Sequence, residues 1–554
     1  MEARSLRTLA AVLLSALAAA LAGAVPASAA RPGGVLLVLD AHGHVRREWD
    51  PYLPPPQPLP APSSALSASA SARTATAKGP TVSAVLMSLE KSGAITSALE
   101  TTDLSTYVAA RKTLTRLTGT RASELGAVIA NLRAIAATGQ LTADRLAELM
   151  LTLSENRQWW STGPLLAADA RVSFPGSRLV WEYYPGQGIE IQWLGTFGQA
   201  NAYWSAGENT DLQQAVAQML SLASARAGGL TWEYDFRFDG GSPPWTSGLS
   251  QGTALQVLAR AAQRLNNPAL IADAHRALAI FTVPPPAGVA VTMPAGTWYA
   301  EYTYAPTDRI LNGFIQSLVG LYDDAMLTGD PLAVSLFQAG DAEARAATPS
   351  YDTGAWSLYD QYGESDLSYH QLLTTFLQNL CSRVESGASV PAPSPALAGA
   401  GAPAEPPTST TPAVGGAPAT GGALAPAPEI LGSASADGIY CTTAQHFTAD
   451  LKTPPVLSLL TRTLTGGRSQ SIRYTISKIS TVTLSVRRGA TLVYRSQALI
   501  GHGTRTFSWT PPTYGGSYSV TVAATDLAGN TGRARGTVLV HPAPKPKTHS
   551  RRPS

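Results

Sequence analysis

The chain has 554 residues, a formal net charge of +3, 44% hydrophobic residues and two cysteines. This length leaves room for several domains, and so few cysteines exclude a small disulfide-held scaffold. The charge is unevenly divided: residues 81–386 carry 18 Lys/Arg against 28 Asp/Glu, whereas residues 455–554 carry 14 against one acid. The two parts therefore meet different electrostatic demands.

The N-terminus has the pattern of an export signal. Arg4 and Arg7 precede an apolar run over residues 9–21, and small residues follow at 25–30. This arrangement predicts a signal peptide over residues 1–30. No later stretch approaches eighteen consecutive apolar residues, so we expect a secreted or cell-surface protein without a transmembrane anchor after cleavage.

Residues 31–80 form an N-terminal segment that ends in a Pro/Ala/Ser-rich linker. Residues 81–156 then place apolar side chains three and four positions apart, which predicts three or four amphipathic helices. Over residues 172–197, a Pro-Gly turn signal between two short apolar runs predicts a small β element, a hairpin. We expect a catalytic domain over residues 81–386 that includes these elements.

Residues 212–386 return to paired helices, with turns at positions 266–267 and 329–330. Helical hairpins of this length, with aromatic and glycine-rich loops between them, predict an incomplete α/α barrel (toroid) whose helix ends line a cleft. Residues 387–428 are Ala/Pro-rich and are expected to be a disordered insertion. Residues 429–454 would supply the final helix of the catalytic domain.

The hydrophobic period changes to two from residue 457 onward, with short strands at regular intervals. This pattern predicts an all-β immunoglobulin-like sandwich over residues 455–541, followed by a basic, Pro-rich tail over residues 542–554. The one-sided positive charge leads to the hypothesis that this module tethers the protein to an anionic surface or cell-envelope polymer and takes no part in the chemistry; the alternative is a solvated sandwich that its charge keeps soluble.

A carboxylate between tyrosines is the strongest chemical signal in the chain. Glu301 lies in the run Trp-Tyr-Ala-Glu-Tyr over residues 298–302, and further tyrosines return at Tyr359 and Tyr369. A glutamate can take a proton from carbon and a phenol can deliver one, so the set suits proton transfer without a metal. Packing of each single tyrosine remains the simpler alternative.

Four motifs resemble the catalytic domain of the D-glucuronyl C5-epimerases: residues 244–252, 298–302, 311–322 and 351–354. The resemblance runs from about residue 245 to residue 370. It implies inversion of C5 in a D-glucuronyl unit of a polysaccharide, which gives an L-iduronyl unit. It also implies that Glu301 is the catalytic carboxylate, with Tyr302 beside it, Tyr359 in a later Tyr-Asp pair, and Tyr369 facing Glu301 across the sugar.

The same motifs supply six expected substrate contacts, which are Trp245, Ser247, Gln251, Tyr299, Asn312 and Asp352, and the resemblance adds His370 as the neighbour of Tyr369. Residues 247–251 read as the start of a helix, whose amide groups and dipole would favour a uronate carboxylate. Alternatively, Gly248 and Gly252 only allow close helix packing. One departure is Gln361, which stands where the animal enzymes carry an arginine.

No cofactor and no metal are expected, because the two cysteines and eight histidines are scattered along the chain. The expected partner is a uronic-acid polysaccharide, unsulfated or lightly modified, and not a nucleic acid. A uronate lyase, a glycoside hydrolase on the same fold and a polysaccharide-binding protein without activity remain alternatives. Cys381 and Cys441 are either one bridge or two buried thiols.

Overall fold

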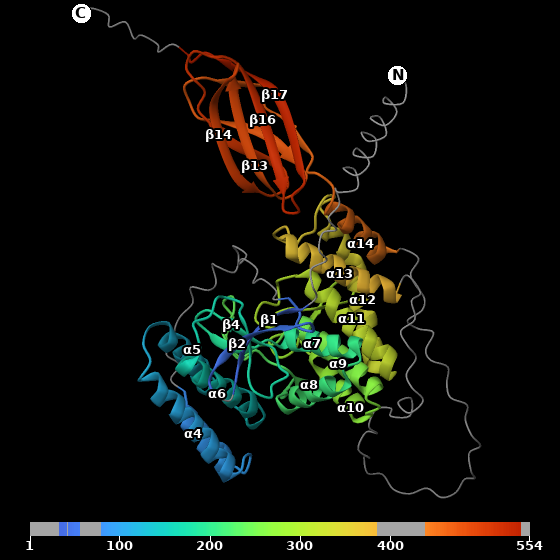
Figure 1. The fold of residues 1–554 in the computed structure, drawn as a ribbon. Helices are drawn as coiled ribbons and strands as arrows, with labels where there is room; N and C mark the ends of the chain where they lie inside the picture. The colour runs from blue at the N-terminus through green and yellow to red at the C-terminus, as the bar shows by residue number, and fades with distance from the viewer. Residues whose placement is uncertain (1–32, 41, 56–78, 385–437, 545–554) are drawn as a thin grey trace, which may run out of the picture.

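The computed structural model describes residues 33–40, 42–55, 79–384 and 438–544. The predicted signal peptide, most of the predicted linker, the insertion at 387–428 and most of the basic tail lie outside the described residues. The chain has several domains: a part built mainly from helices, followed by an all-β region at one end of the molecule (Figure 1).

A five-stranded sheet opens the helical part. Its order is β2 (Val45–Asp50), β1 (Gly34–Leu39), β3 (Arg171–Ser173), β4 (Trp181–Tyr184) and β5 (Gly188–Ile191). The hairpin β4–β5 lies where the sequence predicted it. The sequence pattern predicted no strand over residues 34–50. The reason is that β1 joins the sheet through parallel pairing with β3, which lies far along the chain, and a local pattern does not indicate such a partner.

The second strand of the predicted hairpin is shorter than expected. The predicted β element extends to residue 197, but Trp193 and Leu194 begin helix α7 (Trp193–Ala206). The reason is a helix cap, since the Gln192 side chain accepts a hydrogen bond from the Gly195 amide at 2.8 Å.

Four helices lie between β2 and β3 in the chain: α3 (Val82–Lys91), α4 (Ser97–Leu114), α5 (Gly119–Ala137) and α6 (Leu146–Thr162), of which α5 and α6 pack against β5. Glu124 of α5 accepts hydrogen bonds from the Gly186 and Gly188 amides in the β4–β5 turn. Asn156 of α6 accepts from the Ile189 amide at 2.8 Å and donates to the Ile189 carbonyl at 2.6 Å. The hairpin is therefore held by side chains of two helices.

Paired helices follow. They are α8 (Asn209–Ser221), α9 (Gly248–Arg264), α10 (Ala269–Ala277), α11 (Leu311–Thr328), α12 (Pro331–Ala347) and α13 (Leu367–Val384). Helices α7, α9, α11 and α13 contact one another in that order. Two short hairpins, β6 (Ser224–Arg226) with β7 (Gly229–Thr231) and β8 (Ala290–Thr292) with β9 (Thr297–Tyr299), lie in the connections, as do 3₁₀ turns at Leu278–Phe281 and Thr348–Tyr351.

Glycine decides how closely α9 and α11 approach. A Cβ atom at Gly320 would lie 1.8 Å from the Gly252 carbonyl oxygen, and one at Gly252 would lie 2.6 Å from the Ser317 Cα. Neither contact is possible for a real side chain, so these two glycines serve close helix packing.

Helix α14 (Ile439–Asp450) packs against α13. In the sequence, the two helices are separated by residues 385–437, which the structure does not describe. A disulfide joins Cys381 of α13 to Cys441 of α14, with the two Cα atoms 4.9 Å apart. The bridge that the sequence left open is therefore confirmed, and it fixes α14 beside the helical part.

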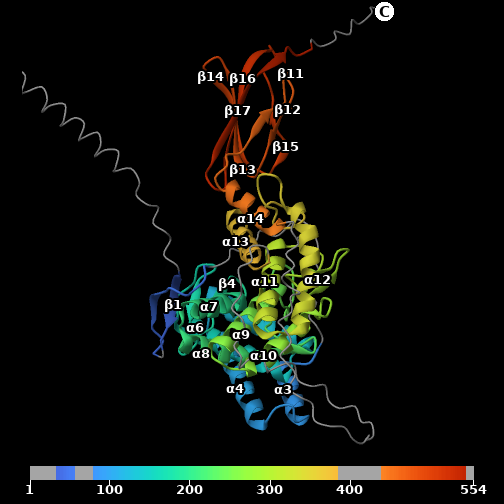
Figure 2. The ribbon, with the colours of Figure 1, turned by 90° about the vertical axis from the view of Figure 1, so that its right-hand side faces the viewer.

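The C-terminal region has two sheets. One has the order β10 (Leu457–Leu459), β12 (Gln470–Ile476), β15 (Gly503–Trp509); the other has the order β11 (Thr463–Thr465), β17 (Thr531–His541), β16 (Gly516–Asp526), β13 (Ser480–Arg488), β14 (Thr491–Ile500). Alternate residues, such as Tyr474 and Tyr518, are buried in one shared core. The end of this region near β13 adjoins α14 in both views (Figures 1 and 2).

Among the described residues, no helix has the length and apolar character that crossing a membrane would require.

The disulfide predicts a measurable stability contribution. It closes a loop with a sequence separation of 60 residues, which the loop-entropy model values at about 4 kcal/mol. We expect the purified protein to show no free thiol under denaturing conditions, and Cys381→Ser with Cys441→Ser to unfold at lower denaturant concentration. Two free thiols in the oxidised protein would contradict this assignment.

Candidate active site

One cavity lies where several helices begin. Ser247 caps the N-terminus of α9, Asn312 lies in the first turn of α11, Tyr369 lies in the first turn of α13, and Gln192 precedes α7. All four line the same cavity as Glu301 and Tyr302. The positive ends of four helix dipoles therefore lie near one space, an arrangement that favours bound anions.

The remaining wall is mostly aromatic and aliphatic. It comprises Tyr184, Leu194, Tyr234, Phe236, Phe238, Trp245, Leu249, Ser250 and Leu372. Sequence reasoning did not identify Tyr234, Phe236 and Phe238. Their alternation just before the Trp245 motif was an available signal, because aromatic residues two apart on an extended chain point to the same side. The structure pairs this stretch with the motif through a Tyr234–Trp245 bridge.

Glu301 is the chemically distinctive residue of the cavity. It follows β9 and is only 6% exposed, and its Oε2 atom has no hydrogen-bond partner among the described residues. That oxygen lies against the start of α11, where a Cβ atom at Gly313 would be 2.3 Å from it. Burial raises the pKa of Glu301 to about 8, although interaction with the Tyr302 hydroxyl opposes the shift.

Three tyrosines surround this carboxyl group. The rings of Tyr359 and Tyr369 have centroids 4.7 Å apart, and Tyr302 interacts with both. Burial and the nearby Glu301 charge raise the pKa of each of the three phenols above the ordinary value. The tyrosines therefore carry their protons at neutral pH, as proton donors must.

Asn312 adds a further polar group without a partner. It is 3% exposed, and neither its Oδ1 nor its Nδ2 atom has a hydrogen-bond partner among the described residues. Buried polar atoms are normally hydrogen-bonded, so such atoms on Asn312 and Glu301 in one cavity indicate a site for a polar ligand. The structure thus brings together Glu301, Tyr302, Tyr369, Trp245, Ser247 and Asn312, with Tyr359 packed against Tyr369.

Two predicted substrate contacts are instead core residues. Tyr299 is fully buried, and its hydroxyl donates to the Leu336 carbonyl at 2.6 Å. Gln251 donates from Nε2 to the Trp232 carbonyl at 2.8 Å. Neither lines the cavity, because the strand and helix that carry them turn these side chains inward.

His370 and Asp352 also require correction. His370 is fully buried and stacks on Trp356, while Nδ1 lies 2.9 Å from Ser357 Oγ and Nε2 lies 3.0 Å from the Phe447 carbonyl. Burial lowers the pKa of His370 to about 4, so the ring is neutral. Neither residue lines the cavity, because both face α14.

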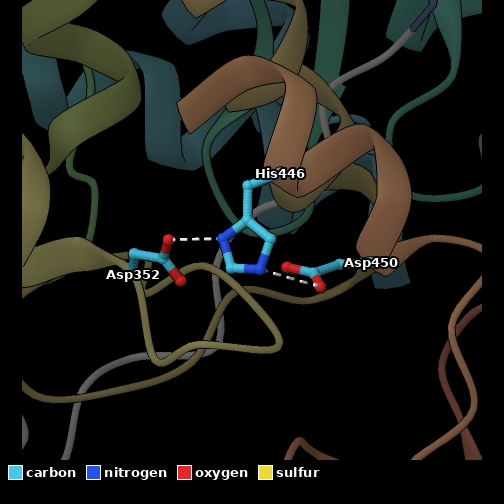
Figure 3. Close-up of side chains that lie close together, drawn as sticks. All are labelled: Asp352, His446 and Asp450. Carbon is cyan, nitrogen blue, oxygen red and sulfur yellow. Dashed lines mark hydrogen bonds and ion pairs between the residues drawn. The ribbon is translucent and has the colours of Figure 1, made fainter. Parts of the chain in front are cut away.

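Asp352 belongs to a separate cluster. His446 of α14 lies between two carboxylates, with Nδ1 2.6 Å from Asp352 Oδ2 and Nε2 3.6 Å from Asp450 Oδ1 (Figure 3). The cluster therefore connects the chain after the Thr348–Tyr351 turn to α14.

The start of α9 is only partly available to an anion. The Gly248 amide donates to the Ala300 carbonyl at 2.9 Å, and the Ser250 amide lies 3.4 Å from Ser247 Oγ. The Gln361 side chain accepts a hydrogen bond from the Arg309 amide and donates one to the Thr307 carbonyl. The side chain therefore stabilises the loop before α11.

Residues 228–388 match the family model described as "D-glucuronyl C5-epimerase C-terminus". A D-glucuronyl C5-epimerase from Caenorhabditis elegans is 33% identical over 131 residues, which is 21% of this chain and 21% of that protein. The resemblance to the D-glucuronyl C5-epimerases is confirmed for this segment. The chain thus matches about a fifth of the length of this relative.

Two solved structures show limited similarity. An engineered protein is 25% identical over 16% of this chain and 20% of its own, with a TM-score of 0.14. The endo-β-1,4-glucanase CMCax from Acetobacter xylinum is 13% identical over 50% of this chain and 93% of its own, with a TM-score of 0.28. At these TM-scores, neither similarity bears on the fold or function of this chain.

The buried Glu301 carboxyl predicts a pH-dependent stability difference. Its pKa rises from the ordinary value of 4.5 to about 8 on folding, so its stabilising protonated form is lost as the pH rises through about 8. Glu301→Gln stays neutral, so its free energy of unfolding relative to wild type should rise between pH 5 and pH 9. Each pKa unit is worth about 1.4 kcal/mol, and urea unfolding at both pH values measures the change.

Glu100→Gln in α4, a site remote from the cavity, is the matched control. A Glu301→Gln difference that is the same at pH 5 and pH 9 would show that the carboxyl is not held in its protonated form.

Proposed function

We propose that the chain is a polysaccharide epimerase, an isomerase that converts D-glucuronyl units to L-iduronyl units by inversion at C5. The observation that carries this proposal is the buried Glu301 carboxyl, whose Oε2 has no hydrogen-bond partner among the described residues, in one cavity with Tyr369. Both residues lie within the segment that matches the epimerase family.

The first step is removal of the C5 proton. The C5–H bond breaks, its proton passes to the Glu301 carboxylate, and the electron pair moves into the uronate carboxyl group as an enediolate. A base with a raised pKa suits this step, since the proton on a carbon next to a carboxylate is weakly acidic. Two features support stabilisation of the enediolate: the helix starts around the cavity and the free amide of Asn312.

The second step is protonation of C5 from the opposite face. The Tyr369 phenol gives its proton to C5 and becomes a phenolate, which completes the inversion. The catalyst resets when the proton on Glu301 returns to Tyr369. Tyr302 interacts with Glu301, Tyr359 and Tyr369, so its hydroxyl and that of Tyr359 offer a path for that return.

The substrate that fits this site is an unsulfated or lightly modified glucuronate polymer, such as a heparosan-like chain. The acidic balance of residues 81–386 disfavours a densely sulfated polymer. We infer that the protein acts outside the cytoplasm, because the signal-like N-terminus and the Cys381–Cys441 disulfide both suit an oxidising compartment. The C-terminal all-β region, called here the β-region (β10 to β17, residues 457–541), is basic, and we propose that it contacts an anionic envelope polymer.

We further infer the finer fold classes. The contact order α7–α9–α11–α13, with α8, α10 and α12 in the connections between them, supports an incomplete α/α barrel. In the C-terminal region, two packed sheets whose strands pair antiparallel, apart from the parallel pair of β11 with β17, support an immunoglobulin-like sandwich.

Proton exchange at C5 tests the proposed reaction. In deuterated water, wild type should exchange the C5 hydrogen of a glucuronate polymer, whereas Glu301→Gln and Tyr369→Phe should lose at least about 100-fold in rate. Exchange should increase as the pH rises through about 8, because Glu301 must be deprotonated to act as the base. NMR of the recovered polymer measures both quantities.

Tyr362→Phe is the matched control, because Tyr362 lies in the same part of the chain but is 63% exposed. Wild-type rates in either active-site variant would remove that residue from the mechanism. Chain cleavage would point elsewhere: an unsaturated product indicates a lyase, and new reducing ends without unsaturation indicate a hydrolase.

A further inference from the structure

The residues that carry Tyr359 and Tyr369 form a compact loop structure, called here the tyrosine segment (residues 351–370). Within it, the Tyr359 amide donates to the Gly363 carbonyl at 2.9 Å and the Ser365 amide donates to the Ser357 carbonyl at 3.0 Å. Between Tyr351 and the start of α13 it pairs through isolated bridges and internal hydrogen bonds, such as that from Trp356 Nε1 to the Ser365 carbonyl at 2.8 Å, rather than through a regular strand. Contacts from neighbouring elements add to these bonds in fixing its geometry.

Helix α14 packs against one side of the tyrosine segment. The buried Trp356–His370 stack has its rings 3.8 Å apart, and His370 reaches the Phe447 carbonyl of α14. The Asp352–His446 pair adds a second contact (Figure 3). The disulfide to α13 then fixes the position of α14 itself.

The β-region holds the tyrosine segment through Glu364. Its Oε1 accepts from the Ile479 amide and its Oε2 accepts from the His502 amide, both at 2.8 Å. The Nδ1 atom of His502 lies 3.1 Å from Oε2, and the Glu364 side chain is only 5% exposed. Hydrogen bonds to a carboxylate are stronger than neutral ones, and both donors here are backbone amides of the β-region.

A buried ion pair joins the same three parts. Lys478 of the β-region is fully buried, and its Nζ lies 2.8 Å from Asp526 Oδ2. The same ammonium group donates to the Asp450 carbonyl at the end of α14 at 2.7 Å and lies 5.3 Å from the Trp356 ring centre. Removing one partner of a buried pair is costly, so these contacts resist separation of the two domains.

We infer that the β-region and α14 are positioning elements for the reaction, with Glu364 as the positioning residue that couples the β-region to Tyr359 and Tyr369. Glu364 lies five residues after Tyr359 and five before Tyr369. This inference rests on the proposed function. It replaces the expectation that the β-region only tethers the enzyme and stands apart from the chemistry.

The inference extends the functional unit beyond the segment that matches the epimerase family, because residues 438–541 lie after that match. A displacement of about 1 Å in a catalytic group can lower a rate about 100-fold. A change in the β-region that moves Glu364 is therefore expected to lower kcat with little effect on KM, since the cavity wall that binds substrate stays intact.

Gly501 allows a test from the β-region side. A Cβ atom at Gly501 would lie 2.7 Å from Glu364 Oε2, so we expect Gly501→Ala to displace the Glu364 carboxylate. The variant does this without substituting Tyr359 or Tyr369. Glu364→Ala removes the carboxylate outright. Thr491→Ala, in the exposed hairpin between β13 and β14, is the control within the same sheet.

The full-length variants are compared by C5 exchange kinetics and by hydrogen–deuterium exchange of peptides from residues 351–370. We expect Gly501→Ala and Glu364→Ala to lower kcat at least about 10-fold at similar KM and to speed amide exchange in the tyrosine segment. Thr491→Ala should match wild type in both measurements.

Wild-type kcat and wild-type amide exchange in both variants would overturn the inference. A fall in kcat without faster amide exchange would also overturn it, because Glu364 would then act by another route. If wild type shows no C5 exchange with any glucuronate polymer, the proposed function fails, and the amide exchange data still decide whether the β-region holds the tyrosine segment.

Discussion

The burial of one carboxyl group against a helix start is the constraint on which this site depends. Glu301 can lie over the first turn of α11 only because residue 313 has no side chain, and its Oε2 has no hydrogen-bond partner among the residues that the structure describes. Burial then keeps the proton on the carboxyl up to about pH 8. The helices, tyrosines and aromatic wall around it keep the Glu301 carboxyl away from bulk solvent and at the wall of the cavity.

The β-region shows how charge divides between folding and binding. Its one acidic residue, Asp526, pairs with buried Lys478, and an acid from the helical part, Glu364, lies at its boundary. No acidic residue of the β-region remains to balance its other Lys and Arg side chains. The same region can therefore hold the tyrosine segment at one end and present positive charge elsewhere.

Local patterns predicted the elements well where one face of an element is buried. Apolar spacing of three and four located α11 and α12, and the period of two located β12, β13 and β16. The same reasoning missed β1 and β2, because β2 is rich in charged residues and β1 joins the sheet through a partner more than a hundred residues away. At the site, the resemblance selected Tyr299 because it lies in one motif with Glu301, and His370 because it follows Tyr369.

The sequence by itself determined the chemistry that is available: a glutamate and several tyrosines in four ordered motifs, with two cysteines that flank a low-complexity stretch. Only the tertiary structure decided which of the selected residues face the cavity, since the rotation of each helix turns Asn312 toward the cavity and His370 toward α14. It also decided that Glu364 meets the β-region. Contacts between segments that are distant in sequence form only when the elements pack together. A local sequence pattern predicts an element but does not identify the element that packs against it.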